Sequence, residues 1–89
     1  MKKKICILGS TGSIGKATLE IISKNKKDFD VVLLSGNNNV KLLIAQAKKF
    51  KPKYIYSNSF YLKDNLKIFC KNNNIYLIDD LSLLKKIKF

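Results

Sequence analysis

Residues 7–22 read ILGSTGSIGKATLEII, and this stretch decides the fold class of the chain. Gly9, Gly12 and Gly15 follow one another at intervals of three residues, after an apolar run and at the start of an amphipathic one. That order indicates a buried strand, a glycine-rich turn and a helix. It is typical of a phosphate-binding turn at the first strand–helix junction of an α/β domain, and a plain bend without a ligand is the alternative.

Each glycine has its own expected role in a phosphate-binding turn. Gly9 allows a sharp turn off the strand, Gly12 places no Cβ between the backbone and a pyrophosphate, and Gly15 allows the helix to pack closely on the sheet. Backbone N–H groups at the start of a helix attract anions, aided by the helix dipole. The donors expected to hold the anion are the backbone N–H groups of Thr11, Gly12, Ser13 and Ile14, with the hydroxyls of Ser10, Thr11 and Ser13.

The spacing G-x-x-G-x-x-G differs from the G-x-G-x-x-G of many NAD enzymes. A Walker A loop is excluded, because no Gly-Lys-Ser or Gly-Lys-Thr follows at the required distance. Lys16 comes directly after Gly15, and we expect it to be a solvated lysine on the outward face of the helix.

Hydrophobic periodicity alternates between strand-like and helix-like segments along the whole chain. Strands are predicted at residues 4–8, 31–35, 54–57 and 75–78, and helices at residues 13–24, 40–50, 60–70 and 81–87. The candidate caps of the last two helices are Asn58 or Ser59, and Asp79 or Asp80. The order βαβαβαβα, with short connections, predicts a parallel sheet with right-handed crossovers. We interpret residues 1–89 as a Rossmann-like α/β unit that is incomplete, because a full dinucleotide-binding domain has six strands.

The same periodicity predicts which faces are buried. Residues 4–8 form a continuous apolar run, so the first strand is expected to be buried on both faces. Cys6 in that strand and Cys70 in the third helix are expected to be buried or half-buried thiols of a reducing compartment. The residues that the first helix is expected to bury are Ile14, Ala17, Ile21 and Ile22.

Charge and hydropathy exclude two classes of partner. The formal net charge is +12, but all 18 basic residues are lysines scattered over the predicted helices. Base readout and bidentate phosphate contacts favour arginine, so no nucleic-acid module is predicted, although a positive field attracts anionic small molecules. No segment approaches the roughly 20 apolar residues that span a bilayer, and the apolar run after the lysine-rich start is too short for a signal peptide. We expect a cytoplasmic protein.

The end of the second predicted strand is the other informative position. NAD enzymes usually place an acidic residue there to bind the ribose hydroxyls, whereas residues 33–40 read LLSGNNNV and contain no acid. The absence of a carboxylate suits the 2′-phosphate of NADP. Neutral donors are available from Ser35, Asn37, Asn38 and Asn39. A polar turn made of good turn formers is an equally valid interpretation of these residues alone.

The two stretches together resemble one known family. ILGSTGSIGKATLEII and the later VVLLSGNNNVKLLIAQAKKFKPKY, residues 31–54, are similar to the N-terminus of the 1-deoxy-D-xylulose 5-phosphate reductoisomerases. The G-S-T-G-S-I-G block is distinctive for that family. The resemblance covers essentially the whole chain and is strongest up to Tyr54.

The resemblance implies an NADPH-dependent enzyme of the non-mevalonate isoprenoid pathway. That family rearranges and reduces its sugar-phosphate substrate to 2-C-methyl-D-erythritol 4-phosphate, uses a divalent metal (Mg or Mn), and forms homodimers. By position, the residues that would hold the cofactor phosphates are Thr11, Gly12, Ser13 and Ile14. Those that would surround the adenosine ribose and its 2′-phosphate are Gly36, Asn37, Asn38 and Asn39.

Two departures from the family pattern bear on function. Asn38 stands where many members carry lysine or arginine, and Asn37 stands where glycine is common, although asparagine tolerates the same positive φ. The chain is also several times shorter than the family enzymes, and its six acidic residues show no convergent pair. We therefore expect the catalytic and C-terminal domains to be absent and the chain alone to be inactive. The alternatives are a fragment of another NADP-linked Rossmann oxidoreductase and a non-catalytic nucleotide-binding module.

Overall fold

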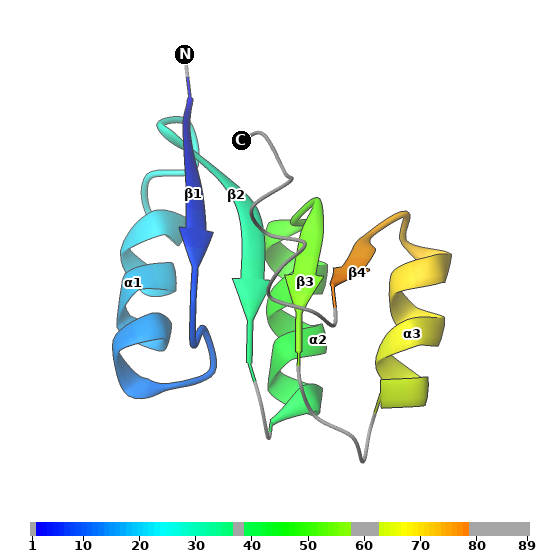
Figure 1. Ribbon diagram of the computed structural model, residues 1–89. Coiled ribbons are helices and arrows are strands. Elements are labelled where there is room, and N and C mark those ends of the chain that lie inside the picture. The colour runs from blue at the N-terminus through cyan, green and yellow to red at the C-terminus, as the bar shows by residue number, and fades with distance from the viewer. Residues whose placement is uncertain (1, 37–38, 58–62, 79–89) are drawn as a thin grey trace.

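Strands and helices alternate along the chain in the computed structural model (Figure 1). The structure describes residues 2–36, 39–57 and 63–78. The strands are β1 (Lys3–Ile7), β2 (Phe29–Ser35), β3 (Tyr54–Tyr56) and β4 (Tyr76–Ile78). The helices are α1 (Ser13–Ser23), α2 (Val40–Phe50) and α3 (Lys63–Asn72). These elements confirm the predicted alternation, while the predicted last helix and the candidate caps at residues 58–59 lie outside the described residues.

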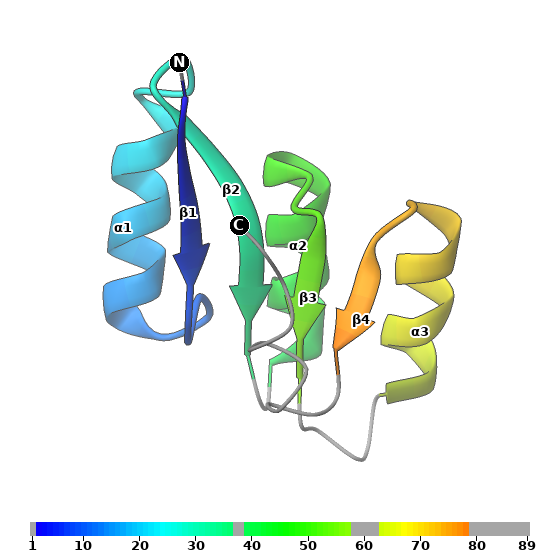
Figure 2. The same cartoon turned by 45° about the horizontal axis from the view of Figure 1, so that its top comes forward.

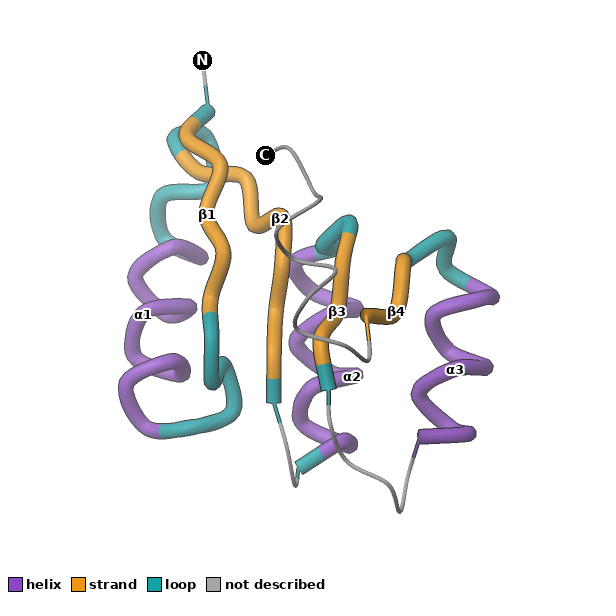
Figure 3. Tube along the Cα trace, viewed as in Figure 1, coloured by secondary structure: helices purple, strands orange, loops and turns teal. Residues whose placement is uncertain are grey.

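The strands form one parallel sheet in the order β1-β2-β3-β4. All the strands point the same way, so the carboxyl ends of the strands and the N-terminal ends of α1, α2 and α3 lie at one edge of the sheet (Figures 1 and 3). Figure 2 shows the strands side by side in sequence order, with α1 beside β1 and α3 beyond β4. The predicted parallel α/β sheet is confirmed, and its two outer strands are β1 and β4.

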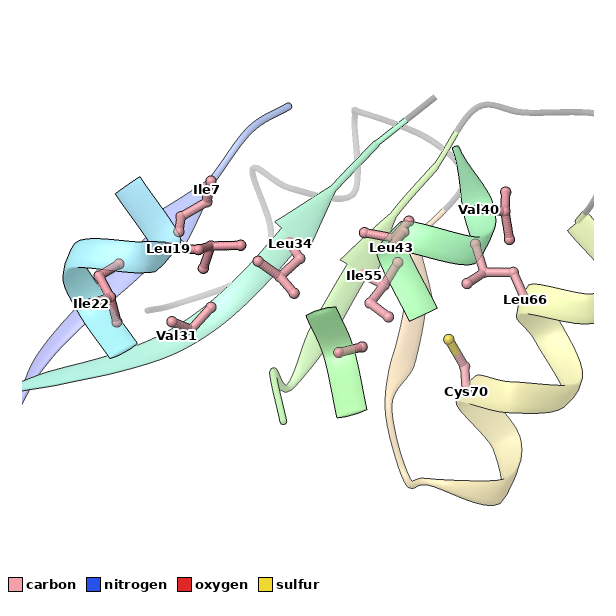
Figure 4. Packing of buried hydrophobic residues seen from close by; sticks show 11 residues of the cluster. Ile7, Leu19, Ile22, Val31, Leu34, Val40, Leu43, Ile55, Leu66 and Cys70 are labelled. Atoms are coloured by element: carbon pink, nitrogen blue, oxygen red, sulfur yellow. The ribbon is translucent and has the colours of Figure 1, made fainter. Parts of the chain in front are cut away.

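A single hydrophobic cluster joins the helices to one face of the sheet. Leu19 and Ile22 of α1 lie against Ile7 and Val31 of the sheet, and the cluster continues through α2 to α3 (Figure 4). The remaining buried members are Leu34, Val40, Leu43, Ala47, Ile55, Leu66 and Cys70. Because α1, α2 and α3 all contribute to this one cluster, they pack on the same face of the sheet.

An irregularity in β2 adjusts which of its residues face the helices. Ile5 of β1 is paired with Val31, but the next residue, Cys6, is paired with Leu33, so Val32 has no partner in β1. One extra residue shifts the alternation of side chains by one position. Val31 and Leu34, which lie on opposite faces of a regular strand, therefore both belong to the cluster beneath the helices.

The buried face of α1 differs from the predicted one. Ile14 and Ile21 are 84% and 62% exposed, and Ala17 is also exposed. The buried residues of α1 are Gly15, Leu19 and Ile22, of which only Ile22 was expected. The physical reason is the close approach at Gly15, which turns the side of the helix that carries Leu19 and Ile22 towards the sheet.

The first strand is not buried on both faces, which corrects a second expectation. Ile5 and Ile7 face the helices, whereas Lys4, Cys6 and Leu8 alternate with them and are exposed. Within residues 2–36, 39–57 and 63–78, β2 is the one strand paired with β1 and α1 packs on one face of β1, while Lys4, Cys6 and Leu8 on the other face are exposed. Cys6 is accordingly an exposed thiol, while Cys70 is buried as expected.

Among residues 2–36, 39–57 and 63–78, no helix is both long and apolar enough to cross a membrane.

Candidate functional site

The glycine-rich turn begins at Gly9, whose backbone requires glycine. Its φ is +70°, in the left-handed region that other residues rarely adopt. A Cβ at Gly9 would meet nothing within 4 Å, so the requirement comes from backbone conformation and not from space. The turn is closed by the N–H of Gly12, which donates to the carbonyl oxygen of Gly9 at 3.0 Å. The sharp turn expected at Gly9 is confirmed.

Gly15 brings α1 into direct contact with this turn. A Cβ at Gly15 would collide with the carbonyl oxygen of Gly9 and would lie only 2.6 Å from the Cα of Ser10. Both neighbours are backbone atoms that cannot swing aside. The close packing expected at Gly15 is therefore confirmed, and the surface against which it packs is the backbone of the turn itself.

The start of α1 presents backbone donors at the edge of the sheet. The first intrahelical bond runs from the N–H of Lys16 to the carbonyl oxygen of Gly12, at 2.9 Å, so the N–H groups of Ser13, Ile14 and Gly15 precede it. The N–H of Gly12 is already used inside the turn, which corrects the expectation that it is available to an anion. The N–H groups of Ser13, Ile14 and Gly15 are therefore the backbone donors at the start of α1 that precede the first intrahelical bond.

Neither of the two helices that begin beside this turn carries an acid in its first turn. The first turn of α1 contains Lys16 and that of α2 contains Lys41, whereas the first turn of α3 contains Asp64. The positive ends of the α1 and α2 dipoles are therefore not offset by a carboxylate of their own. Lys16 is exposed, as expected. The edge of the sheet at α1 and α2 is favourable for an anion.

The turns after β1 and β2 touch one another. A Cβ at Gly36 would lie 3.1 Å from the Oγ1 and 3.2 Å from the Cγ2 of Thr11, so the Thr11 side chain packs against the bare backbone of Gly36. The Asn39 side chain begins α2, because its Oδ1 accepts from the N–H of Leu42 at 3.1 Å. Asn37 and Asn38 lie outside the described residues. Thr11, Gly36 and Asn39 are thus brought to one edge of the sheet by two adjacent strands.

A buried polar network beneath the turn was not anticipated from the sequence. The Ser10 hydroxyl donates to the Oε1 of Gln46 at 2.7 Å, and the Nε2 of Gln46 donates to the Ser10 carbonyl oxygen at 2.8 Å. The Ser35 hydroxyl accepts from the N–H of Gly9 at 2.9 Å. Ser10 and Ser35 are both buried, so their hydroxyls support the turn and do not face a ligand, which corrects the roles expected for them.

One signal for this network is present in the sequence. Gln46 follows Leu43 and precedes Ala47 on the apolar face of α2, where a polar residue interrupts an otherwise hydrophobic stripe. A buried amide requires hydrogen-bond partners. The identity of those partners depends on how α2 sits against the turn, which the sequence of α2 does not contain.

The hollows on the surface do not all coincide with this site. A hollow of about 500 Å³ lies beside the glycine turn and is lined by the end of β1 and by residues including Gly12, Ser13 and Ile14. The larger hollow, of about 600 Å³, lies at the opposite ends of the strands, where residues such as Lys51, Pro52 and Asn73 line it. Backbone donors at the start of a helix favour the first location for a phosphate-bearing ligand.

The part of the chain that the structure describes contains no group of three or more histidines, cysteines or acids placed to hold a metal ion. The described residues therefore do not fit the divalent metal that the resemblance implies.

A family model described as 1-deoxy-D-xylulose 5-phosphate reductoisomerase matches residues 5–85. The chain belongs to this family. Its N-terminal glycine turn, parallel sheet and second turn are thus those of a reductoisomerase chain, and the resemblance inferred from the sequence is confirmed.

Individual relatives agree with the family match. The reductoisomerase of Endomicrobium trichonymphae is 51% identical over 73 residues, which cover 82% of this chain and 19% of that protein. The Zymomonas mobilis reductoisomerase in complex with NADPH has a TM-score of 0.79 at 31% identity, covering 86% of this chain and 20% of that one. A reductoisomerase bound to NADPH, fosmidomycin and magnesium has a TM-score of 0.78 at 30% identity, covering 96% and 21%.

The chain spans about a fifth of the length of these reductoisomerases. The matched part is the Rossmann-like segment that carries both turns.

Proposed function

We propose that this chain is the NADPH-binding N-terminal segment of a 1-deoxy-D-xylulose 5-phosphate reductoisomerase. The observation that carries the proposal is the contact between the two turns, in which Thr11 packs on Gly36 at the edge where α1 and α2 begin. Two solved reductoisomerase structures that share this fold are complexes with NADPH. The complete enzyme would convert 1-deoxy-D-xylulose 5-phosphate to 2-C-methyl-D-erythritol 4-phosphate, with NADPH supplying the hydride.

The residues of the first turn would hold the cofactor phosphates. The N–H groups of Ser13 and Ile14 precede the first intrahelical bond of α1 and favour an anion there, together with Thr11. Gly12 has extended backbone, with φ −78° and ψ 172°, and its missing Cβ leaves room for the pyrophosphate.

The residues of the second turn would select NADPH over NADH. Gly36 leaves room for the Thr11 side chain to pack on its backbone, and the described part of this turn contains no carboxylate that would repel a 2′-phosphate. Asn39 can offer its side-chain amide nitrogen as a donor, because its cap of α2 uses the Oδ1 and no described residue accepts from the nitrogen. Asn37 and Asn38 complete the proposed site and stay predictions.

A titration of NADPH and NADH into the 89-residue chain, followed by nicotinamide fluorescence, tests this proposal. We expect NADPH to bind at least about tenfold more tightly, which corresponds to about 1.4 kcal/mol. Equal affinities would contradict the role proposed for the second turn.

The substitution Gly12→Val tests the first turn in the same assay. Valine adopts the extended backbone of Gly12 readily, and a Cβ there meets only the carbonyl oxygen of Gly9 at an ordinary 3.4 Å. The fold should persist while the side chain fills the pyrophosphate position, so we expect NADPH binding to be abolished. Normal NADPH binding by folded Gly12→Val would show that the turn does not hold the phosphates.

We propose that the rest of the enzyme's chemistry belongs to other segments of the full-length reductoisomerase. Because the described residues do not fit a divalent metal, no step of the reaction is placed on them. The sugar-phosphate substrate, the metal and the homodimer interface are proposed to belong to segments beyond the fifth that this chain spans. The cytoplasmic location and the absence of nucleic-acid partners also stay predictions.

A further inference from the structure

Ser10 is held on three sides by residues from outside the glycine turn. Its N–H donates to the carbonyl oxygen of Ser35 at 2.7 Å, and its side chain and carbonyl oxygen are both bonded to Gln46. The residue is 0% exposed. Every polar group of Ser10 is therefore engaged, and the position of this residue is determined by β2 and α2 together.

The position of Ser10 in turn determines where α1 begins. The backbone of Gly9 and Ser10 is the surface on which Gly15 packs, with no room for even a Cβ between them. A displacement of Ser10 therefore displaces the first turn of α1, where the expected phosphate donors lie. Gln46 reaches this point from another helix through both ends of its side-chain amide.

We propose that Gln46 is a positioning residue that sets the geometry of the phosphate-binding turn without touching the cofactor. An amide is suited to this role because it accepts from the Ser10 hydroxyl with one atom and donates to the Ser10 carbonyl with the other. Both bonds are buried, so water does not replace them when the amide is removed. This inference rests on the proposed NADPH site for its functional consequence, but the positioning itself is measurable without a ligand.

Gln46→Met is the first test, because methionine has a similar length and neither donates nor accepts strongly. We expect the hydrogen exchange of the Gly9 and Ser10 amides to accelerate about tenfold in the ligand-free chain, and NADPH affinity to fall by about tenfold. The matched control is Cys70→Ala. Cys70 is also buried, but it lies on α3, and none of the hydrogen bonds described for the turn involves it. When Cys70→Ala and wild type are compared under conditions in which the same fraction of each is folded, turn-amide exchange and NADPH affinity should be the same in both.

Gln46→Glu makes the two bonds to Ser10 depend on pH within one variant. A protonated glutamic acid can still accept from the Ser10 hydroxyl and donate to the Ser10 carbonyl, whereas a carboxylate cannot donate. In the ligand-free chain, turn-amide protection should be near that of wild type at about pH 4 and lost at about pH 8, relative to wild type at each pH. The charged groups near position 46 in the groove between α1 and α2 are Lys16, Glu20 and Lys49.

The outcomes separate this inference from the proposed function. If the wild-type chain does not bind NADPH, the proposed function fails, and turn-amide exchange alone decides the role of Gln46. Unchanged exchange at Gly9 and Ser10 in Gln46→Met overturns the inference. If Gln46→Met does not fold, Gln46→Glu decides: pH-dependent protection of the turn supports the inference, and protection that follows wild type at every pH overturns it.

Discussion

The fold constrains the three glycines of the turn to different degrees. Gly9 has a positive φ with open space around its Cα, Gly15 lies against backbone, and Gly12 has neither constraint within the chain. A glycine that the fold itself does not require is best explained by something outside the fold. The structure therefore separates Gly12, the candidate ligand position, from the two glycines that shape the turn.

The substitution Gly15→Ala should destabilise the chain, because its Cβ would collide with the Gly9 carbonyl and approach Ser10 to 2.6 Å. Overpacking against backbone costs about 1–3 kcal/mol. Urea unfolding measures this loss, and Gly12→Ala is the matched control, since its Cβ meets Gly9 at an ordinary 3.4 Å. Equal free energies of unfolding for Gly15→Ala and wild type would show that α1 does not pack on the turn as described.

At the scale of single elements, α2 both packs on the sheet and supports the candidate site. Its N-terminus is capped by Asn39, its interior supplies Gln46 to the turn, and its apolar residues Leu43 and Ala47 join the core. One helix thus couples the stability of the fold to the geometry of the candidate cofactor site.

Substitutions at Asn39 should separate these two roles. Asn39→Ala removes the bond to the N–H of Leu42 and should cost about 1 kcal/mol in the free energy of unfolding. Asn39→Asp keeps the cap and should retain stability, but its carboxylate would repel a 2′-phosphate. We expect Asn39→Asp to lower affinity for NADPH much more than for NADH. Equal losses for both cofactors would place the 2′-phosphate away from Asn39.

Helix α3 carries a thiol that links stability to pH. Burial raises the pKa of Cys70 from its ordinary value of 9.0 to about 11. Below pH 9.0 both states keep the proton, but at higher pH the unfolded chain releases it while the folded chain retains it. The free energy of unfolding should therefore fall as pH rises from 9.0 towards 11.

Urea unfolding of wild type and Cys70→Ala across this pH range isolates the contribution of the thiol from that of the lysines and tyrosines. The decrease should be steeper in wild type. Parallel pH profiles for the two proteins would mean that Cys70 is not buried in the folded chain.

The positions of the strands and helices could be predicted from the sequence better than which face of each helix is buried. Apolar periodicity located each described strand and helix to within three residues at either end, because burial of one face imposes that periodicity. It misplaced the buried face of α1, since Ile14, Ala17 and Ile21 also recur at helical spacing. The contact at Gly15 selects between the two stripes, and that contact depends on the path of the turn, which is a property of the tertiary structure.

The site was predictable where local geometry suffices and not where distant residues meet. The positive φ at Gly9 and the helix start at Ser13 follow from the order of residues in one segment. The pairing of Ser10 with Gln46 joins residues 36 positions apart. It requires the register of two strands and the seating of α2, so hydroxyls that seemed suited to a ligand proved to be part of the support.

At the scale of the whole molecule, the surface formed by β1 and the outer side of α1 is not covered by any other described element. β1 is an outer strand, and Leu8, Ile14 and Ile21 are large apolar side chains that are mostly exposed near it. Outer strands with apolar surroundings favour association between chains.

We therefore expect the isolated chain to self-associate, and Ile21→Lys to reduce this association without lowering stability, because the side chain is already solvated. Sedimentation velocity over a concentration series measures the change. Asn65→Lys, which adds the same charge at an exposed position on α3, should have a smaller effect. An identical concentration dependence for Ile21→Lys and wild type would exclude this side of α1 from the contact.

We propose that the turns after β1 and β2 together hold one molecule of NADPH. The most direct test is an NMR titration of the chain with NADPH, in which the amide shifts are mapped residue by residue. We expect the largest changes at Thr11, Gly12, Ser13, Ile14 and Gly36, all saturating with a single affinity. Changes confined to the opposite ends of the strands, around Lys51 and Asn73, would contradict it.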